Sequence, residues 1–199
     1  MSEWSNYKFE KIFDISSGLS KNRKDFGFGF PFASFKDIFY NYFLPENLEN
    51  LANTTEKERK TCSIRNGDLF LTRTSETQDE LGMSSVALKD YEDATFNGFT
   101  KRLRIKDEYR QMIDPLYLGY YMRSTKMRNQ ISSLSIMTTR ASLNNSMINS
   151  LEIDMPHIHK QKRIGRILYS VDNKIENNCK SSRKTTHNYH DSFEQVHIN

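Results

Sequence analysis

The segment from Leu151 to Asn178 constrains the fold most, because a short apolar stretch ends at a proline and a basic amphipathic pattern follows it. Pro156 fixes its own φ near helical values and lacks an amide donor, so it predicts a change from strand to helix. Apolar residues after it recur at helical spacing and form one stripe: Ile164, Ile167, Leu168, Val171 and Ile175. No later apolar pattern in the chain could cover this stripe. We therefore expect it to pack against a helix from another chain.

The composition predicts one globular domain with an extended helix. The 199 residues can bury one core, and 13 Phe, 10 Tyr and 27% charged residues favour a folded chain over a disordered one. No apolar run approaches the roughly 18 residues of a membrane span, and the N-terminus does not resemble a signal peptide. We expect a cytoplasmic protein without a membrane partner. Cys62 and Cys179 have no neighbouring ligands at zinc spacing and are expected to be reduced thiols.

Charge is distributed unevenly along the chain. Residues 1–100 carry 12 basic and 16 acidic side chains, whereas residues 101–184 carry 17 basic and 7 acidic ones. Such a one-sided positive field attracts polyanions, and nucleic acid is therefore the expected class of partner. Basic side chains that only keep helix faces soluble would give the same counts.

Local patterns predict an α+β fold, with a mixed, strand-rich globular domain over residues 1–156 followed by a long C-terminal amphipathic helix of the coiled-coil type. We expect the helix over residues 157–180, and a frayed or disordered polar tail over 181–199. Strands are expected at 12–17, 26–35, 69–72, 84–88 and 95–106, with one more that begins at Leu151. Helices are expected at 53–65, capped by Asn53 or Thr54, from Asp114 through Ile131, and at 144–149.

Residues 102–106 alternate between basic and apolar side chains. With the period of a strand, Leu103 and Ile105 would enter the core while Arg102, Arg104 and Lys106 point outward together. An exposed row of cations can hold phosphates, so Lys101, Arg102 and Arg104 are predicted phosphate contacts.

Two polar loops are candidates for reading bases. The first follows a buried strand and offers one cation with three hydroxyls: Thr72, Arg73, Thr74 and Ser75. Arginine can form a fork of hydrogen bonds with guanine while hydroxyls reach phosphates or bases. A second loop of the same kind contains Thr138, Thr139 and Arg140, and Ser17 and Lys21 could join either one. The alternative is that these are solvated loops with surface cations.

Five segments, taken in their order, resemble the specificity subunits of type I DNA restriction-modification systems. They are WSNYKFEKIFDISSGLS (4–20), IRNGDLFLTRTS (64–75), NGFTKRL (97–103), DPLYLGYYMRS (114–124) and the strand-to-helix segment 153–175, with Gln161, Arg163 and Ile164 in its pattern. The resemblance covers roughly residues 4–180. It implies a target recognition domain that contacts one part of a bipartite DNA site, followed by a helix that sets the distance between two such domains. Family members typically have two of each, so this chain resembles a half-subunit or a fragment.

The resemblance also implies the partners. These are double-stranded DNA, methyltransferase (modification) subunits, the restriction subunit through the complex, and either a second copy of the chain or another specificity chain. We expect no cofactor on this chain, with S-adenosylmethionine and ATP with Mg²⁺ bound only by partner subunits. The sequence lacks a Gly-Lys-Ser/Thr loop, a GxSxG elbow, an HExxH helix and an Asn/Asp-Pro-Pro-aromatic motif, so no catalytic residue is assigned.

Three other interpretations stand beside this resemblance: a metal site, a scaffold and an enzyme. His157 and His159 could bind a metal, but no third ligand lies near them at suitable spacing, so we assign no metal site and expect them to serve the start of the helix. A helix-mediated scaffold or regulator that never reads bases would account for the apolar stripe but would leave the Arg73 loop without a role. A nucleic-acid enzyme that acts alone is the third possibility.

Overall fold

The computed structural model describes the backbone of residues 4–134 and 141–196, and the side chains of residues 4–134 and 142–179. The strands are β1 (Trp4–Lys8), β2 (Phe13–Ser17), β3 (Phe26–Ala33), β4 (Leu51–Ala52), β5 (Leu69–Thr72), β6 (Thr74–Ser75), β7 (Ser84–Val86), β8 (Thr95–Phe96), β9 (Thr100–Ile105), β10 (Ala141–Ser142) and β11 (Glu152–Pro156). The helices are α1 (Phe9–Ile12), α2 (Phe35–Tyr40), α3 (Glu56–Thr61), α4 (Pro115–Met122), α5 (Thr125–Leu134), α6 (Asn145–Ser150) and α7 (Ile158–Val196), with 3-10 turns η1 (Arg23–Asp25) and η2 (Asp107–Tyr109).

The expected mixture of strands and helices is confirmed, but several boundaries differ. Thr55, not Asn53 or Thr54, caps α3, because its hydroxyl accepts from the Glu58 amide while the Glu58 carboxylate accepts from the Thr55 amide. The helix expected from Asp114 through Ile131 is wrong as one element, since it divides into α4 and α5 around Arg123 and Ser124. Pro156 is the last residue of β11 rather than the first residue of a helix.

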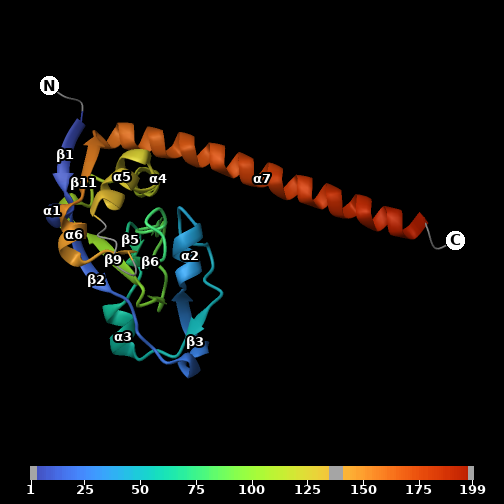
Figure 1. Ribbon diagram of the computed structural model, residues 1–199, viewed down its shortest axis with the longest axis horizontal. Coiled ribbons are helices and arrows are strands. Elements are labelled where there is room, and N and C mark those ends of the chain that lie inside the picture. Colours follow the sequence, from blue (N-terminus) through green and yellow to red (C-terminus); the bar gives the residue numbers. More distant parts are fainter. Residues whose placement is uncertain (1–3, 135–140, 197–199) are drawn as a thin grey trace. The chain divides into compact units, whose positions relative to one another are not determined.

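The central sheet has the strand order β2-β9-β5-β7 and is antiparallel throughout. Leu69 pairs with Leu103, and both side chains enter a core shared with α1, α4, α5 and α6. Leu71 and Ile105 contribute to the same core, as expected for side chains two residues apart in a strand. Helices α4 and α5 lie on this side of the sheet (Figure 1).

The opposite face of the central sheet is also buried. Phe70 points to this side and meets Phe96 edge to face, with 5.1 Å between the ring centroids. Ile38 of α2 and Ile64 complete this second core. It lies against a three-stranded sheet of order β4-β3-β8, in which β3 and β8 are parallel (Figure 1). Strands β5 and β7 are therefore buried on both faces, whereas the edge strand β2 stays partly exposed.

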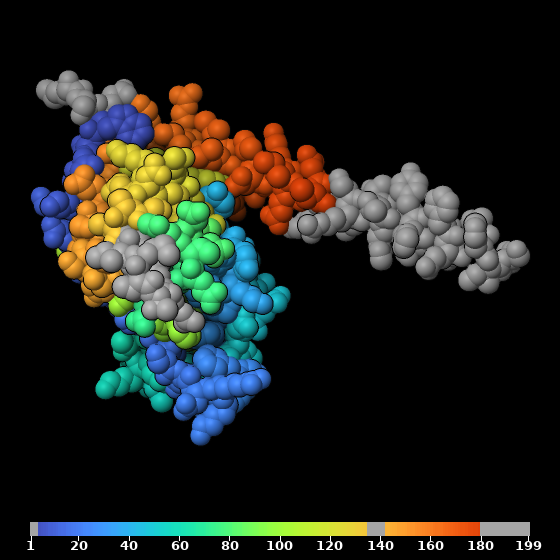
Figure 2. Space-filling model, viewed as in Figure 1, coloured from blue at the N-terminus to red at the C-terminus, as the bar shows by residue number. Residues whose placement is uncertain are grey.

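The segment that follows β6 is fastened to α5. Arg128 of α5 donates to the carbonyl oxygens of Asp79 and Leu81, and Gln78 donates to the carbonyl oxygen of Ser132. In the space-filling view this green segment lies directly against the yellow surface of the helices (Figure 2). These bonds fix the far end of the loop that begins at Arg73.

The chain divides into two compact units, residues 1–165 and 166–199, and α7 runs from one into the other. Within the first unit, Gln161 is buried and its side chain joins the start of α7 to three backbone groups, those of Met112, Asp114 and Pro156. In the second unit Ile167, Leu168, Val171 and Ile175 are exposed. The side chains expected to form a polar tail lie outside the described residues. Among the residues that the structure describes, none of the helices has the length and apolar character of a membrane span.

Candidate nucleic-acid interface

One end of the central sheet brings three predicted DNA contacts together. Ser17 of β2 is the cross-strand partner of Lys101 of β9, and the Lys101 ammonium donates to the Ser17 hydroxyl at 2.9 Å. On the other side of β9, the β5 ladder continues by one bond, in which the Arg73 amide donates to the Phe99 carbonyl oxygen at 3.0 Å. Neighbouring strand ends therefore present Ser17, Lys101 and Arg73 at one place, although they lie far apart in sequence.

The positive charges of Arg73 and Lys101 lie close enough to repel each other. Partial burial lowers the pKa of Lys101, and the positive charge of Arg73 lowers it further. Arg73 is exposed, and its guanidinium has no hydrogen-bond or ion-pair partner among the residues that the structure describes. Two neighbouring cations without a carboxylate between them gain energy when an anion binds, and the phosphate of a nucleic acid is such an anion.

A polar hollow of about 450 Å³ lies beside these cations. Arg73, Thr74 and Lys101 line one part of it, and the segment that leads into α6 lines the other: Ser142, Leu143, Asn144 and Asn145. β6 pairs with β10, and the Leu143 amide donates to the Arg73 carbonyl oxygen at 2.8 Å, so both parts are joined through the backbone. Amide side chains beside a cation are the donors and acceptors that recognise base edges.

Arg102 does not point outward, and the expected exposed row is wrong at this residue. Its side chain is 7% exposed and donates to the Ser63 and Thr61 carbonyl oxygens. Its guanidinium lies 5.6 Å from the centre of the Phe96 ring, and burial lowers its pKa. The alternating pattern separates two strand faces, but it does not reveal that other segments cover the polar face.

Arg104 is also engaged within the fold. It forms an ion pair at 2.6 Å with Asp68, which is almost fully buried. The Lys106 ammonium donates to the Glu10 carbonyl oxygen. Thr72, proposed as part of the reading loop, is fully buried in β5. These residues support the sheet, and of the predicted phosphate row only Lys101 lies at the cationic site.

Lys21 is paired as well. Its ammonium contacts the Glu58 carboxylate of α3, with N–O distances of 2.8 and 2.9 Å to the two oxygens. Thr138, Thr139 and Arg140 lie outside the described residues, so their expected role remains a prediction. The structure thus gathers Ser17, Arg73, Thr74 and Lys101.

The Glu58 carboxylate has a pH-dependent stabilising role. The hydrogen bond from Lys21, together with that from the Thr55 amide, lowers the pKa of Glu58 from 4.5 to about 2. Its stabilisation is therefore complete above pH 4.5 and is lost as the pH falls through about 2. We expect Glu58→Gln to lower the free energy of unfolding by about 0.2–1 kcal/mol near neutral pH, the range for a surface pair. Urea denaturation of both proteins should show this difference shrinking toward pH 2, and a difference that stays constant would contradict the assignment.

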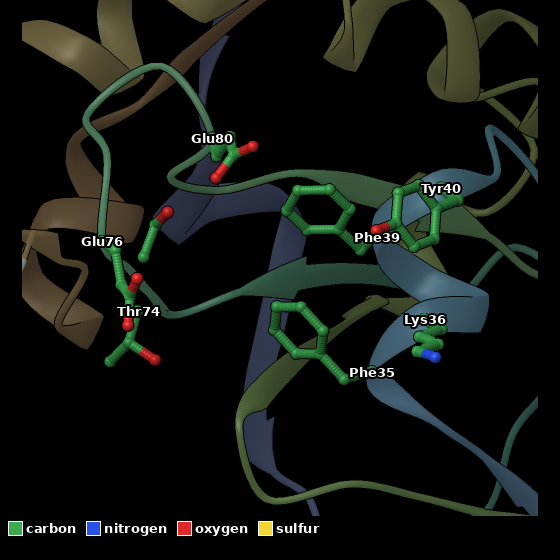
Figure 3. A pocket seen from close by; sticks show the side chains of 8 residues that line it. Phe35, Lys36, Phe39, Tyr40, Thr74, Glu76 and Glu80 are labelled. Carbon is green, nitrogen blue, oxygen red and sulfur yellow. The ribbon is translucent and has the colours of Figure 1, made fainter.

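A second hollow, of about 430 Å³, lies on the other side of Thr74. The rings of Phe35 and Phe39 from α2 stack at 5.5 Å and face Thr74 across it (Figure 3). Lys36, Glu76 and Glu80 also line this hollow, so carboxylates outnumber ammonium groups among the described residues around it. Carboxylates repel phosphates, so the charge favours a nucleic-acid backbone on the Arg73 and Lys101 side of the loop.

Sequence reasoning missed part of the site. The sequence pattern predicts Asn144 and Asn145 only as the start of a helix and does not single out Ser142. Phe99 follows an Asn-Gly turn signal, which indicates that the residue lies at an exposed tip. Elsewhere, the rings of His157 and His159 stack at 5.2 Å, and the described part of the chain holds no group of three or more residues able to bind a metal ion.

Comparisons with known proteins place this chain in a family. Residues 1–183 match the family model described as the type I restriction modification DNA specificity domain. Three solved structures share the fold, and one of them, on complex assembly and conformational transition of the type I R-M system, has a TM-score of 0.63 and 17% sequence identity over 93% of this chain and 42% of that chain. The type I restriction-modification S subunit from M. genitalium has a TM-score of 0.60 and 14% identity over 87% of this chain and 40% of that chain. The HsdS subunit from Thermoanaerobacter tengcongensis has a TM-score of 0.60 and 16% identity over 91% of this chain and 40% of that chain. The chain thus spans about two fifths of the length of each. With the family model covering nearly all of its residues, the chain belongs to the type I restriction-modification DNA specificity domains.

Proposed function

We propose that this chain reads a DNA sequence and thereby directs the methyltransferase and nuclease subunits of a type I restriction-modification system to their target. The observation that carries the proposal is that two cations, exposed Arg73 and Lys101, lie next to each other at the end of the central sheet. A hollow lined by amide side chains lies beside them. Lys101 would hold the phosphate backbone, while Arg73, Asn144 and Asn145 would contact base edges. Family membership supports the same role.

The chemistry would belong to the partners. In this proposal the chain contributes no catalytic residue, and the modification and restriction subunits bring S-adenosylmethionine and ATP with Mg²⁺. The specificity chain would act in the cytoplasm, where the DNA is. Its own contribution is binding energy that differs between sequences.

Binding to labelled DNA duplexes at several salt concentrations tests this function. A reader of DNA should show affinity that falls steeply with salt, plus a part that depends on sequence. The assay uses the full chain alone and together with the methyltransferase subunit from the same cell. A helix-mediated scaffold, the second candidate, should show little binding under either condition, and that result would contradict the proposed function.

The exposed stripe of α7 supports pairing with the helix of another specificity chain, of which a second copy is the simplest. Ile167 and Ile175 are 55% and 56% exposed, which is unusual for two isoleucines on one helix face. We expect Val171→Lys to weaken self-association by about tenfold or more, a change of about 1.4 kcal/mol, because a charge would enter an apolar seam.

Asn173→Lys is the matched control, since it adds the same charge away from the stripe. Sedimentation of the full chain at increasing concentration measures both variants. Equal dimer affinity for Val171→Lys and Asn173→Lys, or a parent chain that stays monomeric, would contradict pairing of two copies.

A further inference from the structure

Phe99 is an exposed aromatic residue at the tip of the turn between β8 and β9. Its side chain is 63% exposed, although a phenylalanine normally gains free energy from burial. Phe99 belongs to neither of the two hydrophobic cores. Single exposed apolar residues are common on protein surfaces, so it is the position of Phe99 beside the cations of the candidate site that points to a ligand contact.

The turn that carries Phe99 is held on several sides. The Phe99 amide donates to the Asn97 side-chain oxygen at 3.0 Å, and Asn97, which is buried, donates to the Ala33 carbonyl oxygen. Gly98 lies so close to the segment after β2 that an added Cβ would be 2.7 Å from the Leu19 carbonyl oxygen. The ring is therefore presented by a backbone that loses little freedom on binding, which favours affinity.

The neighbours of Phe99 are cations and polar groups. Its carbonyl oxygen accepts from the Arg73 amide, and Lys101 follows two residues later in the chain. Ser17 is bound to Lys101. An exposed ring at the same end of the sheet as two cations resembles the wedges that proteins insert between base pairs while nearby cations hold the strand.

We infer that Phe99 is a base-contacting wedge, which enters the duplex at a base step between the phosphate held by Lys101 and the base edge contacted by Arg73, and partly unstacks it. This inference deepens the proposed DNA recognition and rests on it. A protein partner fits the surroundings less well, because protein interfaces place apolar residues in an apolar centre that is poor in charge. The wedge would add sequence preference, since pyrimidine–purine steps open most easily.

Three variants of the full chain test the wedge. Phe99→Ala removes the ring, and Phe99→Leu keeps an apolar wedge of a type that other DNA-bending proteins use. Phe28→Ala is the matched control: Phe28 is also exposed, at 52%, but it lies near the beginning of β3. The parallel register of β3 with β8 pairs Ala33 with Phe96, so Phe28 lies at the end of that sheet away from the Phe99 turn.

The parent chain with its methyltransferase subunit first selects duplexes from a randomised library. The selected duplex then carries 2-aminopurine at successive adenine positions, because this base fluoresces more when it is unstacked. We expect the parent and Phe28→Ala to raise the fluorescence at one step. Phe99→Ala should lose that signal and bind about tenfold more weakly, and Phe99→Leu should keep most of both.

The outcomes separate the wedge from the proposed function. If Phe99→Ala binds and unstacks the duplex as the parent does, the wedge is wrong while DNA recognition stands. If Phe99→Ala loses the methyltransferase subunit but keeps its DNA affinity and signal, Phe99 is a protein contact and the wedge is again wrong. A parent chain that selects no duplex overturns both, before any variant is compared. Thermal unfolding of each variant confirms that the exposed substitution leaves the fold intact.

Discussion

Arg123→Ala is expected to lower the free energy of unfolding by about 3 kcal/mol or more, because several buried carbonyl groups would lose their charged donor together. The Arg123 guanidinium donates to the carbonyl oxygens of Ser84 in β7 and of Ile38, Phe39 and Asn41 at the end of α2. It also lies 4.7 Å from the centre of the Tyr42 ring. The Arg123 side chain thus links the break between α4 and α5 to β7 and to the end of α2.

Arg123→Lys is the control for this prediction. It keeps the positive charge and the aliphatic stem, but an ammonium group cannot reproduce the planar fork that reaches β7 and α2 at once. We expect an intermediate loss of stability, measured by guanidinium chloride denaturation of all three proteins. A loss below about 1 kcal/mol for Arg123→Ala would show that water replaces the arginine at these carbonyls.

Arg73→Ala is expected to cost about 1–3 kcal/mol of binding free energy on the preferred DNA sequence and to relax the preference for that sequence. The physical reason is that a forked contact with a base edge is lost, and a random duplex offers that contact only by chance. Lys101→Ala should instead weaken binding to every duplex by a similar factor and reduce the dependence on salt, because it removes a phosphate contact.

Comparing Arg73→Ala with Lys101→Ala distinguishes a base contact from a phosphate contact. Each is titrated against the selected duplex and against a scrambled duplex of equal length and composition. Arg73→Ala should bring the ratio of the affinity for the selected duplex to that for the scrambled duplex closer to one. Lys101→Ala should leave that ratio unchanged. Equal losses on both duplexes for Arg73→Ala would show that Arg73 contacts the backbone and does not read bases.

The patterns that predicted the fold correctly were those with local causes. The Leu69–Thr72 strand is fully buried, and Leu103 and Ile105 enter the core as their spacing requires. The helix expected at 144–149 is observed as α6, and the cap that Asn144 provides there is likewise a local effect of side chain on backbone. Such features depend on a few adjacent residues, so a single sequence contains enough information to predict them.

The misjudged residues depend on contacts between distant segments. Arg102 is buried because residues 61–63 and Phe96 cover its face of the sheet, and Arg104 is held by Asp68 across the adjoining strand. The meeting of Ser17, Arg73 and Lys101 comes from strand register, which fixes which side chains are neighbours. An alternating pattern can locate a strand without stating its partners, so the site could be predicted only in pieces.

The most direct test of the central claim is a map of methylated bases in cells that carry the complete system, cells that lack this chain, and cells in which the chain carries Arg73→Ala. If the chain chooses the DNA target, its removal should abolish at least one methylated sequence motif, and Arg73→Ala should lose that motif or make it less stringent. The same motifs at the same occupancy in all three strains would contradict the claim that this chain directs methylation to a DNA sequence.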